Sequence, residues 1–127
     1  MLKFTDVCFI TDNVQALASF YEKLFDVKAE GDETHSIIVL PKFGIAIYSK
    51  TAAMNDPPEL DCTDYSNDRF YIGFNCDDAA TEYERIKSLG ICTTPTKPIV
   101  WPGGAKSFYF KDIDGNMIVV RSCPKKT

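Results

Sequence analysis

Histidine is almost missing from this sequence, which has one, His35, in 127 residues. A single histidine limits acid–base mechanisms built on imidazole, including a Ser/His/Asp or Cys/His arrangement. His35 follows a polar stretch, and we interpret it as an exposed residue at the head of a strand. The five cysteines contain no CxxC pair, and Cys8 and Cys76 fall inside strand-like runs. This pattern favours free thiols in a reducing cytosol over a disulfide framework.

Long apolar runs and positive charge are also lacking. No run approaches the roughly 18 apolar residues of a membrane span, and residues 1–4 do not begin a signal peptide. The net charge is −4, whereas nucleic-acid binding calls for a basic face. The hydrophobic share of 45% and charged share of 25% are ordinary for a globular protein. We therefore expect one cytoplasmic domain over 1–127 that binds neither nucleic acid nor a membrane.

The chain repeats one unit of a strand, a helix and further strands. In the first half the spacing predicts a strand at 4–11, a helix at 14–25 and strands at 27–30, 36–40 and 45–49. In the second half it predicts a strand at 70–76, a helix at 79–89 and strands at 92–94, 98–101, 106–111 and 117–122. Residues 51–68, with two prolines and no periodicity, are interpreted as a connector. Two such modules, about 1–50 and 69–127, suggest a shared sheet.

Turn and cap residues support these boundaries. Asp12 or Asn13 precedes the first helix, and the pair Asp77 and Asp78 precedes the second, as N-cap residues do. Gly90 follows the second helix where a left-handed C-terminal residue is common. Residues 112–116, read as DIDGN, predict a tight hairpin because Asp-Gly and Gly-Asn tolerate positive φ.

Two motifs resemble a known family. FYEKLFD at the end of the first helix, and FYFKDIDGN after a Gly-Gly turn and a tryptophan, resemble the vicinal oxygen chelate superfamily of glyoxalases, bleomycin-resistance proteins and extradiol dioxygenases. The likeness covers nearly the whole chain except the connector, and Ile113 replaces the proline usual in DPDGN. The resemblance implies an α+β fold: two βαβββ modules forming a curved, roughly eight-stranded mixed sheet around a cleft, with helices on the convex side. It also implies a homodimer.

Metal-dependent members of that superfamily hold one divalent ion with four inward side chains. By motif position these correspond here to Asp6, Ala46, Tyr71 and Val119. Alanine and valine supply no donor atom, and tyrosine is a poor ligand unless it is ionised. The resemblance therefore predicts a member without the metal site, without a cofactor and without the chemistry that depends on the ion.

Strand alternation assigns a mostly apolar and aromatic face to the cleft. Its predicted members are Asp6, Cys8, Ile10, Tyr48, Tyr71, Asn75, Trp101, Tyr109, Met117, Val119 and Arg121. Aromatic walls stack on planar ligands, although the same side chains suit a filled cleft or a dimer interface. Arg121 is placed either to meet a carboxylate or phosphate or to lie solvated at the rim. A neighbouring carboxylate disfavours the thiolate form of a cysteine, so we interpret Cys8, next to Asp6 on this face, as a wall residue rather than a nucleophile.

Four functions remain open. The leading hypothesis is a metal-free protein that sequesters or senses a planar or amphipathic small molecule, with the acidic balance favouring a cationic one. The alternative is a lyase or isomerase in which Asp6 or Tyr71 is the acid–base group. A metal enzyme with ligands at unaligned positions is the third, and a structural role with a filled cleft is the fourth.

Overall fold

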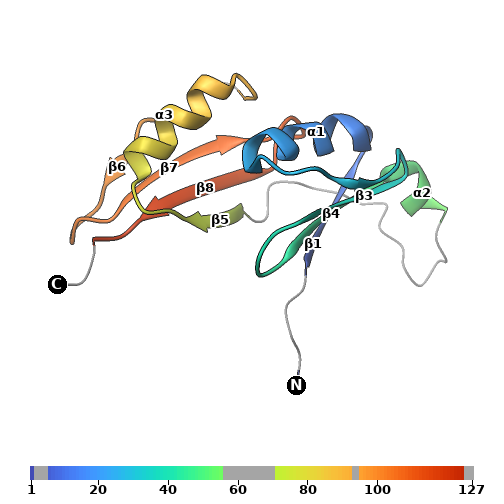
Figure 1. Cartoon of the computed structure of the whole chain (residues 1–127), viewed down its shortest axis with the longest axis horizontal. Coiled ribbons are helices and arrows are strands. Elements are labelled where there is room, and N and C mark those ends of the chain that lie inside the picture. Colours follow the sequence, from blue (N-terminus) through green and yellow to red (C-terminus); the bar gives the residue numbers. More distant parts are fainter. Residues whose placement is uncertain (2–5, 56–70, 93–94, 125–127) are drawn as a thin grey trace. The chain divides into compact units, whose positions relative to one another are not determined.

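The computed structural model describes residues 1, 6–55, 71–92 and 95–124. The chain divides into two compact units, Met1–Ser66 and Asn67–Thr127. Each unit contains a four-stranded mixed sheet and a helix that packs on one face of it (Figure 1). The α+β class and the two βαβββ modules are therefore confirmed. Within the described residues, no helix combines the length and apolar character that crossing a membrane would require.

The first sheet has the strand order β1-β4-β3-β2. Its elements are β1 (Asp6–Thr11), α1 (Val14–Phe25), β2 (Glu30–Gly31), β3 (His35–Val39) and β4 (Gly44–Ser49). The side chain of Asn13 caps α1 by accepting a hydrogen bond from the Ala16 amide at 3.0 Å. The ring of Phe9 stacks on Tyr21 of α1 with centroids 5.6 Å apart. Alternate residues of β1 therefore face α1, and Asp6, Cys8 and Ile10 lie on the open face.

The second sheet repeats this plan with the order β5-β8-β7-β6. Its elements are β5 (Tyr71–Asn75), α3 (Ala79–Leu89), β6 (Ile99–Val100), β7 (Lys106–Lys111) and β8 (Met117–Ser122). Asp78 caps α3 through the Ala80 amide, and Gly90 ends it with φ 65°. Tyr83 of α3 meets the buried ring of Phe108 edge to face at 5.6 Å. Among the described residues of this unit, no helix packs on the opposite face of the sheet.

Three local predictions need correction. The first residues of the expected connector form a short helix, α2 (Lys50–Met54), because Ser49 caps it through the Ala52 amide at 3.3 Å and two alanines favour helix. The strand expected at 27–30 is replaced by the two-residue β2. The residues before it bind α1 instead, because the Val27 amide donates to the main-chain carbonyl of Glu22 and the Ala29 amide donates to its side-chain carboxylate.

The third correction concerns the strand expected at 92–94. Cys92 lies in a bend rather than in a strand, while residues 93–94 lie outside the described part of the chain. Residues 56–68 of the expected connector lie outside it as well.

The DIDGN motif is a hairpin turn whose first and last residues are buried. Oδ1 of Asp112 accepts hydrogen bonds from the amides of Asp114 and Asn116, each at 2.9 Å. Its Oδ2 accepts another from Nδ2 of Asn116 at 2.7 Å, and Gly115 takes φ 85°. Asp112 and Asn116 are both buried. The motif thus fixes the register of β7 and β8, which positions the open face of the second sheet.

Candidate functional site

Side chains from three strands meet in rows on the open face of the second sheet. In the register, Tyr109 pairs with Val119, and Arg121 pairs with Asn75 on one side and Ser107 on the other. Directly paired residues of neighbouring strands point to the same face of a sheet. Because Phe108 points toward α3, its neighbours Ser107 and Tyr109 point away from it.

This face is hollowed. The hollow has a volume of about 360 Å³, within the range of roughly 300–1,000 Å³ that is usual for ligand pockets. Three of its lining residues are aromatic and none is acidic. The complete set of lining residues is Tyr71, Trp101, Ala105, Lys106, Ser107, Tyr109, Val119, Arg121 and Cys123.

Trp101 is held at the edge of the hollow by a tight turn. Its main-chain amide donates to Ala105 at 2.7 Å, and the Gly104 amide donates to the Trp101 carbonyl at 3.0 Å. Its indole Nε1 donates to Oγ of Ser107 at 2.7 Å. Gly103 and Gly104 both take φ 91°, which a residue with a side chain rarely adopts. The indole is therefore oriented although 46% of the residue's surface is exposed.

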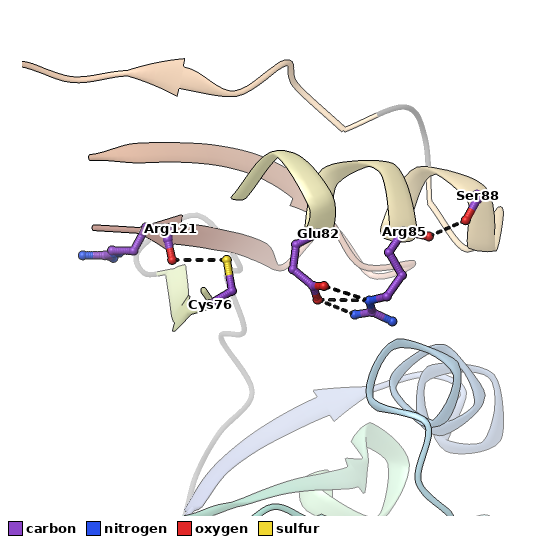
Figure 2. A network of polar contacts seen from close by, with 5 residues as sticks. All are labelled: Cys76, Glu82, Arg85, Ser88 and Arg121. Carbon is purple, nitrogen blue, oxygen red and sulfur yellow. Dashed lines mark hydrogen bonds and ion pairs between the residues drawn. The ribbon is translucent and has the colours of Figure 1, made fainter. Parts of the chain in front are cut away.

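Arg121 lies across its neighbouring strand, over a residue without a side chain. A Cβ built on Gly73 would come within 2.7 Å of Nη2 of Arg121 and 3.6 Å of the Tyr71 ring. Glycine therefore leaves the space that the guanidinium occupies beside Tyr71. The carbonyl of Arg121 accepts from the amide of Cys76 at 2.9 Å and from its Sγ at 3.5 Å, while the side chain points away from Cys76 (Figure 2).

The charge in the hollow is positive. In the described part of the chain, the only ion pair is Arg85 with Glu82 on α3, at 2.8 Å (Figure 2), and no carboxylate pairs with Arg121. Lys106 also borders the hollow, but the register pairs it with Ser122, whose hydroxyl accepts from the first amide of α3. The Thr81 hydroxyl, the Ala80 amide and the charge of Lys106 lower the pKa of Asp78. The strand position of Lys106 thus faces α3, whereas that of Arg121 faces the hollow.

One thiol borders the hollow and two lie elsewhere in partly buried positions. Cys123 is exposed and lines the hollow. Burial, and then the nearby Glu82, raise the pKa of Cys76. Burial alone raises the pKa of Cys92. These shifts keep both thiols protonated at neutral pH, which makes them poor nucleophiles.

The remaining residues predicted to line the cleft lie on the first sheet. Cys8 pairs with Ala46, and Ile10 pairs with Tyr48, so all four lie on its open face with Asp6. His35 is exposed at the start of β3, as predicted, and its ring meets that of Tyr48 edge to face at 5.9 Å. A single cleft built from both modules stays a prediction.

The four family positions do not fit a divalent metal ion. The first module contributes Asp6 and Ala46, and the second contributes Tyr71 and Val119. Ala46 and Val119 are both buried and offer no donor atom. Among the residues described, no group of three or more His, Cys, Asp or Glu side chains comes close enough to hold an ion.

Sequence alternation identified five residues of the hollow and missed others. Those identified are Tyr71, Trp101, Tyr109, Val119 and Arg121. Asn75 and Met117 share the same sheet face but do not line the hollow. Ser107 and Cys123 were missed, although each lies two residues from a predicted member and the same alternation points to both.

Comparison with known proteins agrees with this architecture. The family model of the Glyoxalase/Bleomycin resistance protein/Dioxygenase superfamily matches residues 3–120. No curated protein matches the sequence of the chain. A glyoxalase/bleomycin resistance protein/dioxygenase from Nocardioides has a TM-score of 0.80 and 16% identity, covering 100% of this chain and 87% of its own.

Two further solved structures are similar. A family enzyme from Burkholderia phytofirmans PsJN has a TM-score of 0.79 and 15% identity, with 97% of this chain and 100% of that chain covered. Lactoylglutathione lyase from Agrobacterium tumefaciens has a TM-score of 0.72 and 16% identity, with 96% of this chain and 94% of that chain covered. At such identities the likeness concerns the fold, and function has to come from the site.

Proposed function

Since the chain belongs to the Glyoxalase/Bleomycin resistance protein/Dioxygenase superfamily, we propose that it is a metal-independent small-molecule-binding protein. The ligand is a planar molecule that the chain sequesters or senses, held on the open face of the second sheet. The observation that carries the proposal is the hollow of about 360 Å³ with Tyr71, Trp101 and Tyr109 in its wall.

Aromatic residues make this hollow suited to a flat ligand. An aromatic side chain offers a large contact area at small entropic cost, and ring pairs gain about 0.5–1.5 kcal/mol beyond simple burial. The indole of Trp101 is already oriented by Ser107, so little further ordering is needed when a ligand stacks on it. Tyr71 is 56% exposed and has surface left to bury.

Metal independence follows from the donor set. With Ala46 and Val119 at two of the four family positions, at most Asp6 and Tyr71 could offer oxygen atoms, which is too few for a stable transition-metal site. Binding is therefore expected to be the same before and after treatment with a chelator.

The test is a calorimetric titration of chelator-treated protein with planar ligands, starting with 2-naphthoate and 2-naphthamide. Binding should be saturable, and a ligand at about 100 times its Kd should raise stability by roughly 2.7 kcal/mol. Tyr109→Ala should weaken binding. Ile113→Ala, which removes an exposed apolar side chain outside the hollow, is the matched control. Absence of binding, or binding restored only by added metal, would contradict the proposal.

The enzymatic alternative is separated by the fate of the ligand. A lyase or isomerase that uses Tyr71 or Asp6 as acid–base group would convert the bound molecule. The proposed binding protein returns it unchanged, which chromatography of the titration mixture after prolonged incubation can establish.

A further inference from the structure

We infer that the ligand of this hollow is an aromatic carboxylate whose carboxyl group is held by Arg121. The inference rests on the proposed function and names the ligand class for the same site. It reverses the expectation from net charge, since an overall charge of −4 favours a cationic ligand whereas the lining of the hollow contains no acid.

Arg121 is available as an anchor. Its guanidinium lies over Gly73 beside the ring of Tyr71, and no carboxylate pairs with it in the described part of the chain. A planar guanidinium presents parallel N–H groups that match the two oxygens of a carboxylate. The hydrogen bonds that Arg121 makes to Cys76 use its main-chain carbonyl, so they fix the strand without occupying the side chain.

A second donor lies next to Arg121. Ser107 pairs directly with Arg121 in the register, is buried and lines the hollow. Its Oγ accepts from the Trp101 indole, and no acceptor takes its hydroxyl proton among the residues described. A hydroxyl can accept and donate at once, so this proton can go to a ligand oxygen. The hydrogen bond also places the indole within reach of the ring that carries the carboxylate.

A single negative charge fits this arrangement better than two. Of the two cations among the described lining residues, Arg121 is the one whose strand position faces the hollow, because Lys106 shares the α3 face with Ser122. A phosphate ester, which carries close to two charges at neutral pH, would find no second cation on the sheet face of Arg121 among the lining residues. An ammonium group on the ligand would be repelled by the guanidinium, because both carry a positive charge.

The experiment is a calorimetric titration of the full chain with four naphthalene probes that share one ring system. These are 2-naphthoate, neutral 2-naphthamide, 2-naphthylmethylammonium and 2-naphthyl phosphate. The naphthoate should bind about 10- to 100-fold more tightly than the amide, which is the usual worth of hydrogen bonds to a charged group. It should also bind more tightly than the ammonium and the phosphate.

Arg121→Gln should remove the preference of naphthoate over naphthamide. Arg85→Gln removes the same charge from the surface of α3 and should keep the full preference. Circular dichroism establishes that each variant is folded, and if Arg121→Gln is not, the ranking of the four probes on the unaltered chain decides.

The outcomes separate this inference from the proposed function. Equal affinity for naphthoate and naphthamide, or tighter binding of the ammonium or the phosphate, overturns the carboxylate assignment and leaves the binding function intact. An unchanged preference in folded Arg121→Gln overturns the role of Arg121. Failure of all four probes to bind overturns both proposals.

Discussion

Replacing Gly73 with alanine should weaken carboxylate binding without destabilising the protein. The added Cβ would lie 2.7 Å from Nη2 of Arg121, where ordinary contact begins at 3.4 Å. The guanidinium must therefore move by at least about 0.7 Å. It is the far end of a flexible side chain, so the movement costs little, but it takes the N–H groups out of line with a bound carboxylate.

Stability should change in the opposite direction from affinity. Gly73 lies within β5 and does not have positive φ, so alanine fits its backbone. Under those conditions Gly→Ala raises the free energy of unfolding by about 0.4–1 kcal/mol, because the unfolded chain loses freedom. Loss of charged hydrogen bonds should weaken naphthoate binding by up to about 1.5–3 kcal/mol. Affinity for the neutral amide should change much less.

The assay pairs urea unfolding with calorimetric titration of naphthoate and naphthamide. Gly44→Ala is the matched control, since Gly44 lies in β4 of the other sheet, lacks positive φ and has its nearest atoms at 3.4 Å. Unchanged naphthoate affinity in Gly73→Ala would refute the anchoring role of Arg121. Joint loss of stability and of affinity for both probes would instead show that β5 itself had been disturbed.

The remaining predictions concern the scaffold and its titrating groups. Asn13→Ala should lower the free energy of unfolding in urea by about 1 kcal/mol by removing the cap of α1, whereas Asn13→Asp should be nearly neutral. Asp112→Ala should cost at least about 2 kcal/mol in the same assay, because it leaves the partly buried amide of Asp114 and the buried amide of Asn116 without their acceptor. The pKa of Asp78 is lowered, chiefly by Thr81, so its contribution to stability is full above the unfolded pKa and is lost as pH falls through the folded pKa. Asp78→Asn should therefore flatten the acid side of the stability–pH curve, and an unchanged curve would contradict this. Burial raises the pKa of Cys92, so iodoacetamide at neutral pH should label the exposed Cys123 before Cys92 by peptide mass spectrometry, and bound naphthoate should protect Cys123.

Elements with local signals were predictable from sequence. The bounds of α1 and α3 match the predicted helices because Asn13, Asp78 and Gly90 satisfy helix ends through neighbours in the chain. The strands β7 and β8 also match, since the Asp112 turn is encoded within five residues. Alternation also predicted the common sheet face of Tyr71, Tyr109, Val119 and Arg121 that the register shows.

Features that depend on contacts beyond the neighbouring residues were not predictable. The short extent of β2 depends on Glu22, seven residues before the Ala29 amide that its carboxylate accepts from. The hydrogen bond from Trp101 to Ser107 and the position of Arg121 over Gly73 need the pairing of β5, β8 and β7. Net charge misled the choice of ligand because it averages the whole surface, whereas a ligand meets the few groups lining one hollow.

The most direct measurement is a crystal structure of the chelator-treated chain grown with 2-naphthoate. We expect the naphthalene ring against Tyr71, Trp101 and Tyr109, its carboxylate on Arg121, and no metal at Asp6, Ala46, Tyr71 and Val119. A naphthoate bound elsewhere, or held through a metal ion at those positions, would contradict this expectation.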